Sequence, residues 1–251
     1  MNATLTAGSV AASLLAAVMV GKRLRRVLPL DHQGAETRET IKLAAGLVAT
    51  MTALLMGLLV SSAKNSYDAT RGQVVQMAAR VAYLDRLLAE YGPEAVEVRS
   101  RLRVMNEKAV RRIWPEEEDS RSDLAPERNA GNEVFSAALR LSPQNDVQRT
   151  LKDQAVAVLA ELGQSRELLL FQSIPSVSTL LLIVVVTWLV LIFFSFSLIA
   201  PDNTTAALSL VVSAVSVSGA IFLLLELDQP FSGLMKISPE PLVRTLSQIA
   251  N

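Results

Sequence analysis

The sequence predicts an all-α membrane protein, with four transmembrane helices per subunit and a helical, water-exposed insert between the second and the third. Two observations lead to this prediction. The chain of 251 residues is 51% hydrophobic and only 19% charged, whereas soluble domains average about 25% charged residues. The charges are also segregated along the chain. We therefore divide it into a first helix pair (residues 1–63), the insert (64–172), a second helix pair (173–228) and a C-terminal tail (229–251).

Four runs without a charged side chain are long enough to cross a bilayer, since about 20 helical residues span roughly 30 Å of hydrocarbon. They are Asn2–Val20, Leu43–Ala63, Ser173–Ala200 and Asn203–Leu225. Pro201 and Asp202 interrupt the chain between the last two runs. Cations follow the first run and none precedes it, an order opposite to that of a cleavable signal peptide. We therefore expect the first run to be a retained membrane helix.

The insert holds most of the charged residues and is predicted to contain three helices. Apolar residues recur with a helical period in Ser66–Tyr91, where Gly92-Pro93 ends the pattern, in Glu94–Ile113, and in Asn145–Phe171. The acidic segment Glu116–Arg128, which contains Pro and Ser, is predicted to be disordered. Three such helices bury little apolar surface alone, so we expect their apolar stripes to meet those of neighbouring subunits as well as one another.

Composition excludes several classes of function. The chain has no cysteine, one histidine and equal numbers of cationic and acidic residues, so we expect no metal site, no cofactor and no nucleic-acid partner. We place His32 on the surface, and Trp114 and Trp188 are isolated in the sequence. No acid, base and nucleophile constellation is present, which argues against an enzyme. Arginines between Arg99 and Arg112 alternate with glutamates, a pattern typical of a solvated or intersubunit salt-bridge surface.

Several motifs together resemble a known family. They are LVATMTALLMGLLVSSAKNSYD (Leu47–Asp68), AYLDRLLAEYGPEA (Ala82–Ala95), IWP (Ile113–Pro115) and ELDQPFSGLMKISPEPL (Glu226–Leu242). The chain is similar over almost its whole length to bacterial bestrophin-like membrane proteins. It resembles the bestrophins themselves in layout. Those are pentameric anion channels with four membrane helices per subunit and a cytosolic helical domain. The resemblance implies a pentamer whose second membrane helix lines the pore, but it does not extend to the bestrophin calcium clasp.

The second membrane segment has the most informative pattern. Small and hydroxyl-bearing residues recur every three or four positions and so share one helix face that ends at a cation. These residues are Gly46, Thr50, Ala53, Gly57, Ser61 and Lys64. Such a face is typical of close helix packing. Alternatively, it lines a water-filled axial path in which Lys64 from each subunit concentrates anions. If the resemblance holds, apolar rings formed by Met51, Leu55, Leu58 and Leu59 would instead be the constriction, because such rings gate by dewetting.

The fourth segment carries a second set of small residues and ends in two carboxylates. Ser209, Ser213, Ser216 and Ala220 share one face, where serines usually bond to their own helix or to a neighbour. Glu226 and Asp228 follow the apolar run directly. They mark either an ordinary interfacial helix end, or a cation site or gate-controlling contact positioned by the turn Gln229–Gly233.

Two considerations favour opposite orientations of the chain in the membrane. The basic loop Lys22–Arg26 favours a cytoplasmic location for the first connection, which would put the termini and insert outside. The bestrophin layout favours the reverse, and we adopt it: a multi-pass protein of the bacterial inner membrane with termini and insert in the cytoplasm. We predict a homo-oligomeric channel for small inorganic ions. A membrane-anchored scaffold or signalling module whose insert binds a partner protein is the alternative, and a small-solute transporter is the third hypothesis.

Overall fold

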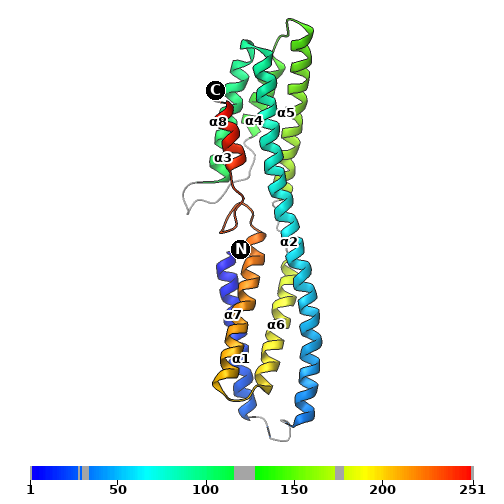
Figure 1. Cartoon of the computed structure of the whole chain (residues 1–251), viewed down its shortest axis with the longest axis vertical. Coiled ribbons are helices and arrows are strands. Elements are labelled where there is room, and N and C mark those ends of the chain that lie inside the picture. Colours follow the sequence, from blue (N-terminus) through cyan, green and yellow to red (C-terminus); the bar gives the residue numbers. More distant parts are fainter. Residues whose placement is uncertain (1, 28, 30–33, 116–127, 173–177, 250–251) are drawn as a thin grey trace. The chain divides into compact units, whose positions relative to one another are not determined.

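The structure is a computed structural model that describes residues 2–27, 29, 34–115, 128–172 and 178–249. Every regular element among these residues is a helix, which confirms the predicted all-α class (Figure 1). The helices are α1 (Ala3–Val27), α2 (Ala35–Tyr91), the 3-10 turn η2 (Pro93–Ala95), α3 (Val96–Ile113), α4 (Arg128–Leu139), α5 (Asp146–Gln172), α6 (Thr179–Ile199), α7 (Thr204–Leu227) and α8 (Glu240–Ile249). His32 and residues 116–127 of the segment predicted to be disordered lie outside the described residues, whereas the last residue of that segment, Arg128, begins α4.

The chain forms two compact units. The first comprises Met1–Asn65 and Ser176–Asp228, and the second comprises Ser66–Pro175 and Gln229–Asn251. Helix α2 is continuous, so its first part belongs to one unit and its second part to the other. The tail that the sequence analysis separated, 229–251, is grouped with the second unit.

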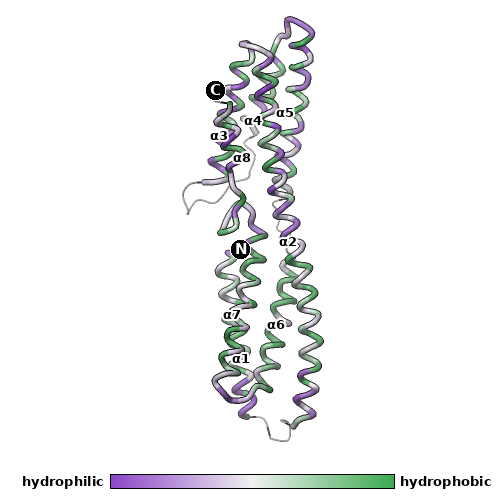
Figure 2. Tube along the Cα trace, viewed as in Figure 1, coloured by the Kyte–Doolittle hydropathy of each residue, from purple (hydrophilic) through white to green (hydrophobic). Residues whose placement is uncertain are grey.

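The first unit contains the helices that are long and apolar enough to cross a membrane: α1, α2, α6 and α7. Helix α1 packs against both α6 and α7, and Figure 2 shows these helices as mainly hydrophobic. Fully buried side chains from all three form the core, among them Leu14, Val185 and Ile221. Burial of this kind gives little hydrophobic driving force inside a bilayer, so close van der Waals packing holds the helices together.

Helices α1 and α6 approach each other closely at Gly21. A Cβ atom placed there would lie 2.9 Å from both the Phe194 carbonyl oxygen and the Ser197 Cβ. The buried Ser197 hydroxyl donates a hydrogen bond of 2.6 Å to the Val18 carbonyl oxygen on α1. A small residue that admits the neighbouring backbone, together with a serine hydrogen bond between helices, is a typical way of joining membrane helices. Glycine is therefore required at this contact.

The turn between α6 and α7 falls where Pro201 and Asp202 predict it. The Asn203 side chain caps α7 by accepting a hydrogen bond of 2.8 Å from the Ala206 amide. The Arg25 guanidinium of α1 donates to the Ala200 carbonyl oxygen at the end of α6. A cation at this position satisfies a terminal carbonyl and interacts favourably with the negative end of the helix dipole.

The second unit is a helical bundle with its own core. The predicted amphipathic stripe is confirmed at Val74, Ala78, Leu84 and Leu88, which are buried, whereas Val75 is exposed. The predicted end at Gly92-Pro93 is also confirmed, since Gly92 has φ 119° and α2 stops at Tyr91. This backbone conformation is readily available only to glycine.

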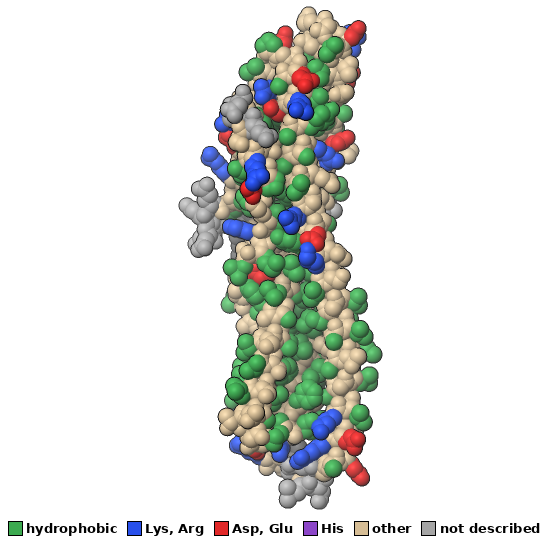
Figure 3. Space-filling model, in the orientation of Figure 1, with side chains coloured by type: hydrophobic (Ala, Val, Ile, Leu, Met, Phe, Trp, Pro, Cys, Tyr) green, Lys and Arg blue, Asp and Glu red, His purple; other side chains and the backbone are tan. Residues whose placement is uncertain are grey.

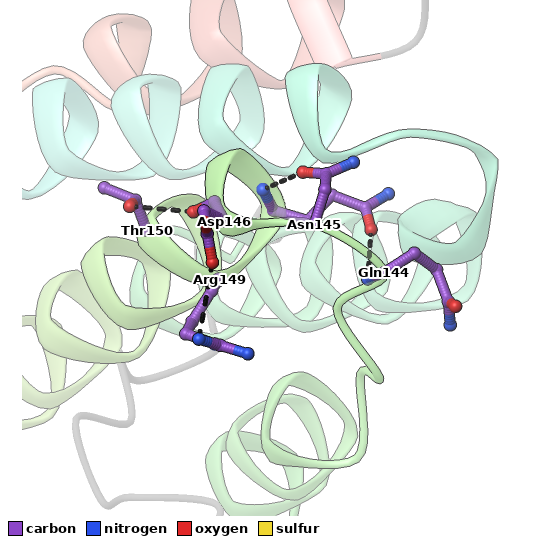
Figure 4. A network of polar contacts seen from close by, with 6 residues as sticks. Gln144, Asn145, Asp146, Arg149 and Thr150 are labelled. Atoms are coloured by element: carbon purple, nitrogen blue, oxygen red, sulfur yellow. Dashed lines mark hydrogen bonds and ion pairs between the residues drawn. The ribbon is translucent and has the colours of Figure 1, made fainter.

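Helix α5 begins one residue after its predicted start, where polar side chains form a network of contacts (Figure 4). The Asn145 side chain accepts a hydrogen bond of 2.8 Å from the Gln148 amide, and the Gln148 side-chain oxygen accepts one of 2.7 Å from the Gln144 amide. This reciprocal arrangement resembles a capping box. The Gln148 side-chain nitrogen also donates to the Tyr91 carbonyl oxygen at 2.9 Å. The capping side chain therefore joins two helices.

The prediction of three helices for the insert was incomplete, because α4 lies between α3 and α5. Helix α4 has only two buried residues among its described side chains, Val134 and Ala138, so its sequence has too short an apolar stripe to reveal it. Helix α8 in the tail was also missed. Two nearby prolines obscured it, and the polar Thr245 is one of the three buried residues among its described side chains.

Candidate functional site

The candidate pore-lining residues lie on the side of α2 that faces away from the core of their own unit. Thr50, Ala53, Gly57, Ser61 and Lys64 are all exposed. The opposite side of the same helix carries the buried residues Thr52, Leu59 and Ala63. A Cβ atom placed at Gly46 or Gly57 would meet no atom within 4 Å. Close packing inside the subunit therefore does not explain the small residues of this outward face.

The apolar residues considered for a constriction differ in how far they are buried. Met51 and Leu58 are 47% and 68% exposed and lie beside the outward face. Leu55 is half-buried against the core of the first unit, and Leu59 is fully part of that core. The four residues share one stripe of the helix, but only Met51 and Leu58 are free of the subunit core.

Two charged boundary positions of the first unit have different environments. Lys64 is exposed at the end of the outward face, whereas Glu226, in the last turn of α7, is 5% exposed. Asp228 is half-buried and caps the same helix. Each of the three interacts with a further group. Among the described residues, no set of three or more acidic or histidine side chains is arranged to hold a metal ion.

The serine face of α7 is exposed in the subunit, and one of its hydroxyls bonds locally. Ser209, Ser213 and Ser216 are exposed. The Ser216 hydroxyl donates a hydrogen bond of 2.9 Å to the Val212 carbonyl oxygen one turn earlier. This back-bonding to its own helix is the ordinary behaviour of serine in membrane helices. The α7 face therefore gives no sign of a separate site.

Sequence reasoning missed the role of Trp114, which is not isolated in the second unit. Its indole N–H donates a hydrogen bond of 2.6 Å to the Ile237 carbonyl oxygen, and its ring meets Phe231 edge to face at 5.7 Å. Leu242 belongs to the same apolar cluster. The contact joins the IWP motif at the end of α3 to the QPFSGLMKISPEPL segment. Two motifs far apart in sequence thus form one structural feature.

We predict that Trp114→Phe loosens the segment 229–249 while leaving the helices of the first unit intact. The substitution keeps the ring but leaves the Ile237 carbonyl without its donor, which costs about 1–3 kcal/mol for a buried acceptor. Hydrogen exchange should rise over residues 229–249. Trp188→Phe, in α6, is the matched control and should leave exchange in this segment unchanged. Equal exchange in both variants would show that the indole hydrogen bond does not hold the segment.

The arginine-rich helix α3 is neutralised within the subunit at several positions. Arg99 forms a two-point ion pair with Asp85 of α2, with N–O distances of 2.7 and 3.0 Å. The hydrogen bonds that Arg99 donates to the Asp85 carboxylate raise the pKa of Arg99 above its usual value. Arg101 and Arg103 pair with acids one turn away on α3 itself, at exposed positions. This surface therefore has the solvated salt bridges that the sequence pattern suggested, plus one partly buried pair.

A family model described as a bestrophin-like domain matches residues 10–242. Two crystal structures of a bacterial bestrophin homologue from Klebsiella pneumoniae, each with one substitution, are similar to this chain. The first has a TM-score of 0.65 and 13% identity and covers 94% of this chain and 97% of its own. The second has a TM-score of 0.59 and 17% identity and covers 96% and 95%. No curated protein matches the sequence.

Proposed function

The chain belongs to the bestrophin-like family, and from this premise we propose that it forms a homo-oligomeric channel for small inorganic ions. In the proposed assembly, the outward face of α2 surrounds a central axis. The observation that most supports this proposal is the side of α2 on which the polar and small residues lie. They face away from the core of their own unit, and two glycines there have open space beside them. Five subunits would follow from the resemblance to bestrophins.

The chemistry of the outward face suits passage of ions with their water. The Thr50 hydroxyl donates to the Gly46 carbonyl oxygen at 3.0 Å, which leaves its oxygen lone pairs to accept from water. Glycine and alanine at the intervening positions leave width for a hydrated path. Lys64, repeated around the axis, would raise the local concentration of anions at the end of the path. The lining residues in this proposal are Thr50, Ala53, Gly57, Ser61 and Lys64.

A hydrophobic constriction would then come from the exposed apolar residues beside the polar face. We assign this role to Met51 and Leu58, with Leu55 as a half-buried neighbour. Rings of such side chains block ions by excluding water from a narrow passage. At the end of α7, we assign Glu226 and Asp228 to a contact that controls opening. If the Glu226→Gln channel opened as often as the unaltered channel, Glu226 would have no role in opening.

Cysteine substitution tests the lining directly, because the natural chain has no cysteine. We predict that a charged thiol reagent changes the current through the Ala53→Cys and Ser61→Cys channels, since both side chains would face the ion path. Thr52→Cys is the control on the buried side of the same helix, with 4% exposure of the native threonine. Single-channel recordings before and after the reagent provide the measurement. Modification that affects Thr52→Cys alone would place the path on the other side of α2.

We propose that the chain is a multi-pass protein of the inner membrane, with the termini and the second unit in the cytoplasm. Asp202, in the α6–α7 turn, and Ser142, before α5, are both exposed. A membrane-impermeant maleimide applied to cells with a permeabilised outer membrane should label Asp202→Cys, and it should label Ser142→Cys only after lysis. Labelling of Ser142→Cys in intact cells would reverse the assigned orientation.

A further inference from the structure

One end of the first unit carries an excess of cationic side chains. This end is formed by the last turns of α1, the first turns of α2 and the turn between α6 and α7. Its described cations are Lys22, Arg23, Arg25, Arg26, Arg38 and Lys42, and its described acids are Glu36, Glu39 and Asp202. We call the six cations the basic cluster. Figure 3 shows cationic and acidic side chains gathered at this end, next to a surface that is largely hydrophobic.

The α1 part of the basic cluster is held in place by helix packing. The close approach at Gly21 fixes the end of α1 against α6. Directly after it, Lys22 and Arg25 are half-buried, while Arg23 and Arg26 are exposed. Because Arg25 donates to the Ala200 carbonyl oxygen, the guanidinium is anchored at the end of α6. These cations therefore stand at the boundary of the apolar helices in a fixed arrangement.

Among the described residues, no ion pair neutralises the other cations of the cluster. Within the described part of the chain, none of Lys22, Arg23, Arg26, Arg38 and Lys42 forms an ion pair with another side chain. On α2, Arg38 lies two turns before the buried Ala45 and so shares its side of the helix. Glu39 instead lies two turns before the exposed Gly46. Arg38 and Glu39 therefore lie on different sides of α2, and Lys42 lies between them.

We propose that the basic cluster binds the headgroups of anionic phospholipids, such as phosphatidylglycerol and cardiolipin. Cations at the ends of apolar membrane helices lie at the depth of the lipid phosphates, and each contributes attraction to an anionic surface. The lipid phosphodiester is a better occupant than a free anion, because its acyl chains lie along the adjoining apolar helix surface. Exposed apolar residues of α1 next to the cluster, including Met19, Val20 and Leu24, offer that surface. The site is independent of ion conduction.

Lipid binding to purified full-length protein tests this inference. Native mass spectrometry in detergent, with phosphatidylglycerol or phosphatidylcholine titrated in, reports bound lipid regardless of how the chain inserts in cells. The cluster variant combines Arg23→Gln, Arg26→Gln, Arg38→Gln and Lys42→Gln. We expect each cation removed to weaken phosphatidylglycerol binding on the order of fivefold, with phosphatidylcholine binding unchanged. If the four changes together disturb assembly, the pair Arg38→Gln and Lys42→Gln is measured instead.

A control with the same change in net charge separates a local site from a general electrostatic effect. It replaces four cations of the second unit with glutamine: Arg101, Arg103, Arg140 and Arg149. All four lie outside the apolar helices of the first unit. Equal loss of phosphatidylglycerol binding in both variants, or no loss in the cluster variant, would overturn the proposal. Displacement of the lipid by soluble glycerol phosphate at similar concentration would show a site for free anions, which would also overturn it.

Discussion

Replacing Gly21 by alanine is expected to destabilise the first unit by about 1–3 kcal/mol, the range typical of overpacking a close contact. The added Cβ would lie 2.9 Å from a backbone oxygen of α6 as well as from the Ser197 Cβ. A backbone atom cannot turn aside as the end of a long side chain can, so α1 and α6 must separate. That separation would also stretch the hydrogen bond from Ser197 to Val18. The midpoint of thermal unfolding, followed by size-exclusion chromatography of detergent-purified protein, measures the loss.

Gly8 on the same helix provides the control for this substitution. A Cβ atom there would meet nothing within 4 Å, so Gly8→Ala should be neutral or slightly stabilising, because alanine has the higher helix propensity. Gly21→Ala with an unchanged midpoint would mean that α1 and α6 are not packed as closely as described. A larger side chain, as in Gly21→Leu, should prevent recovery of folded protein altogether.

Lys64→Glu is expected to change the charge preference of the conducted ions by about tenfold. The substitution replaces a positive by a negative charge in every subunit at the end of the proposed path. An electrostatic difference of only about 1.4 kcal/mol alters a ratio of ion affinities tenfold. With a salt gradient across a planar bilayer, the reversal potential should move toward that of a cation-selective pore. The direction of this shift follows from the charge alone and does not require knowledge of the native selectivity.

Arg149→Glu makes the same charge change at an exposed position in the first turn of α5 and should leave the reversal potential unchanged. A negative charge in that turn interacts favourably with the helix dipole, so the control should also fold normally. If the two variants shifted the reversal potential equally, the effect would arise from the overall charge of the protein. Lys64 would then have no special place at the ion path.

The membrane helices could be predicted from sequence because charge is excluded from hydrocarbon, so each uncharged run delimits a span. Other features depend on contacts that no local pattern encodes. Helix α2 continues through Lys64 and Asn65 because polar residues do not break a helix, although they do end an apolar run. Trp114 looked isolated because its partners, Phe231 and Ile237, are more than a hundred residues away in the sequence.

For the candidate site too, the sequence pattern predicted part of the arrangement, and the rest depends on packing. The periodicity of α2 grouped Thr50, Ala53, Gly57 and Ser61 on one face, but it could not indicate which face meets the subunit core. Burial of Leu59 and Ala63 supplies that information and removes Leu59 from the candidate constriction. The small residue that does join helices within the subunit, Gly21, stands next to a basic segment. The sequence around Gly21 indicates the end of a helix, but it does not indicate that Gly21 packs against α6.

Electrical recording from the purified, assembled protein in a planar bilayer tests the central proposal most directly. We expect discrete, salt-dependent channel currents that appear with the protein and are absent from protein-free bilayers. We also expect that a bulky residue on the outward face, Gly57→Phe, abolishes these currents without altering the oligomer. Correctly assembled protein that stays electrically silent over a wide range of voltage and salt would rule out the proposed channel.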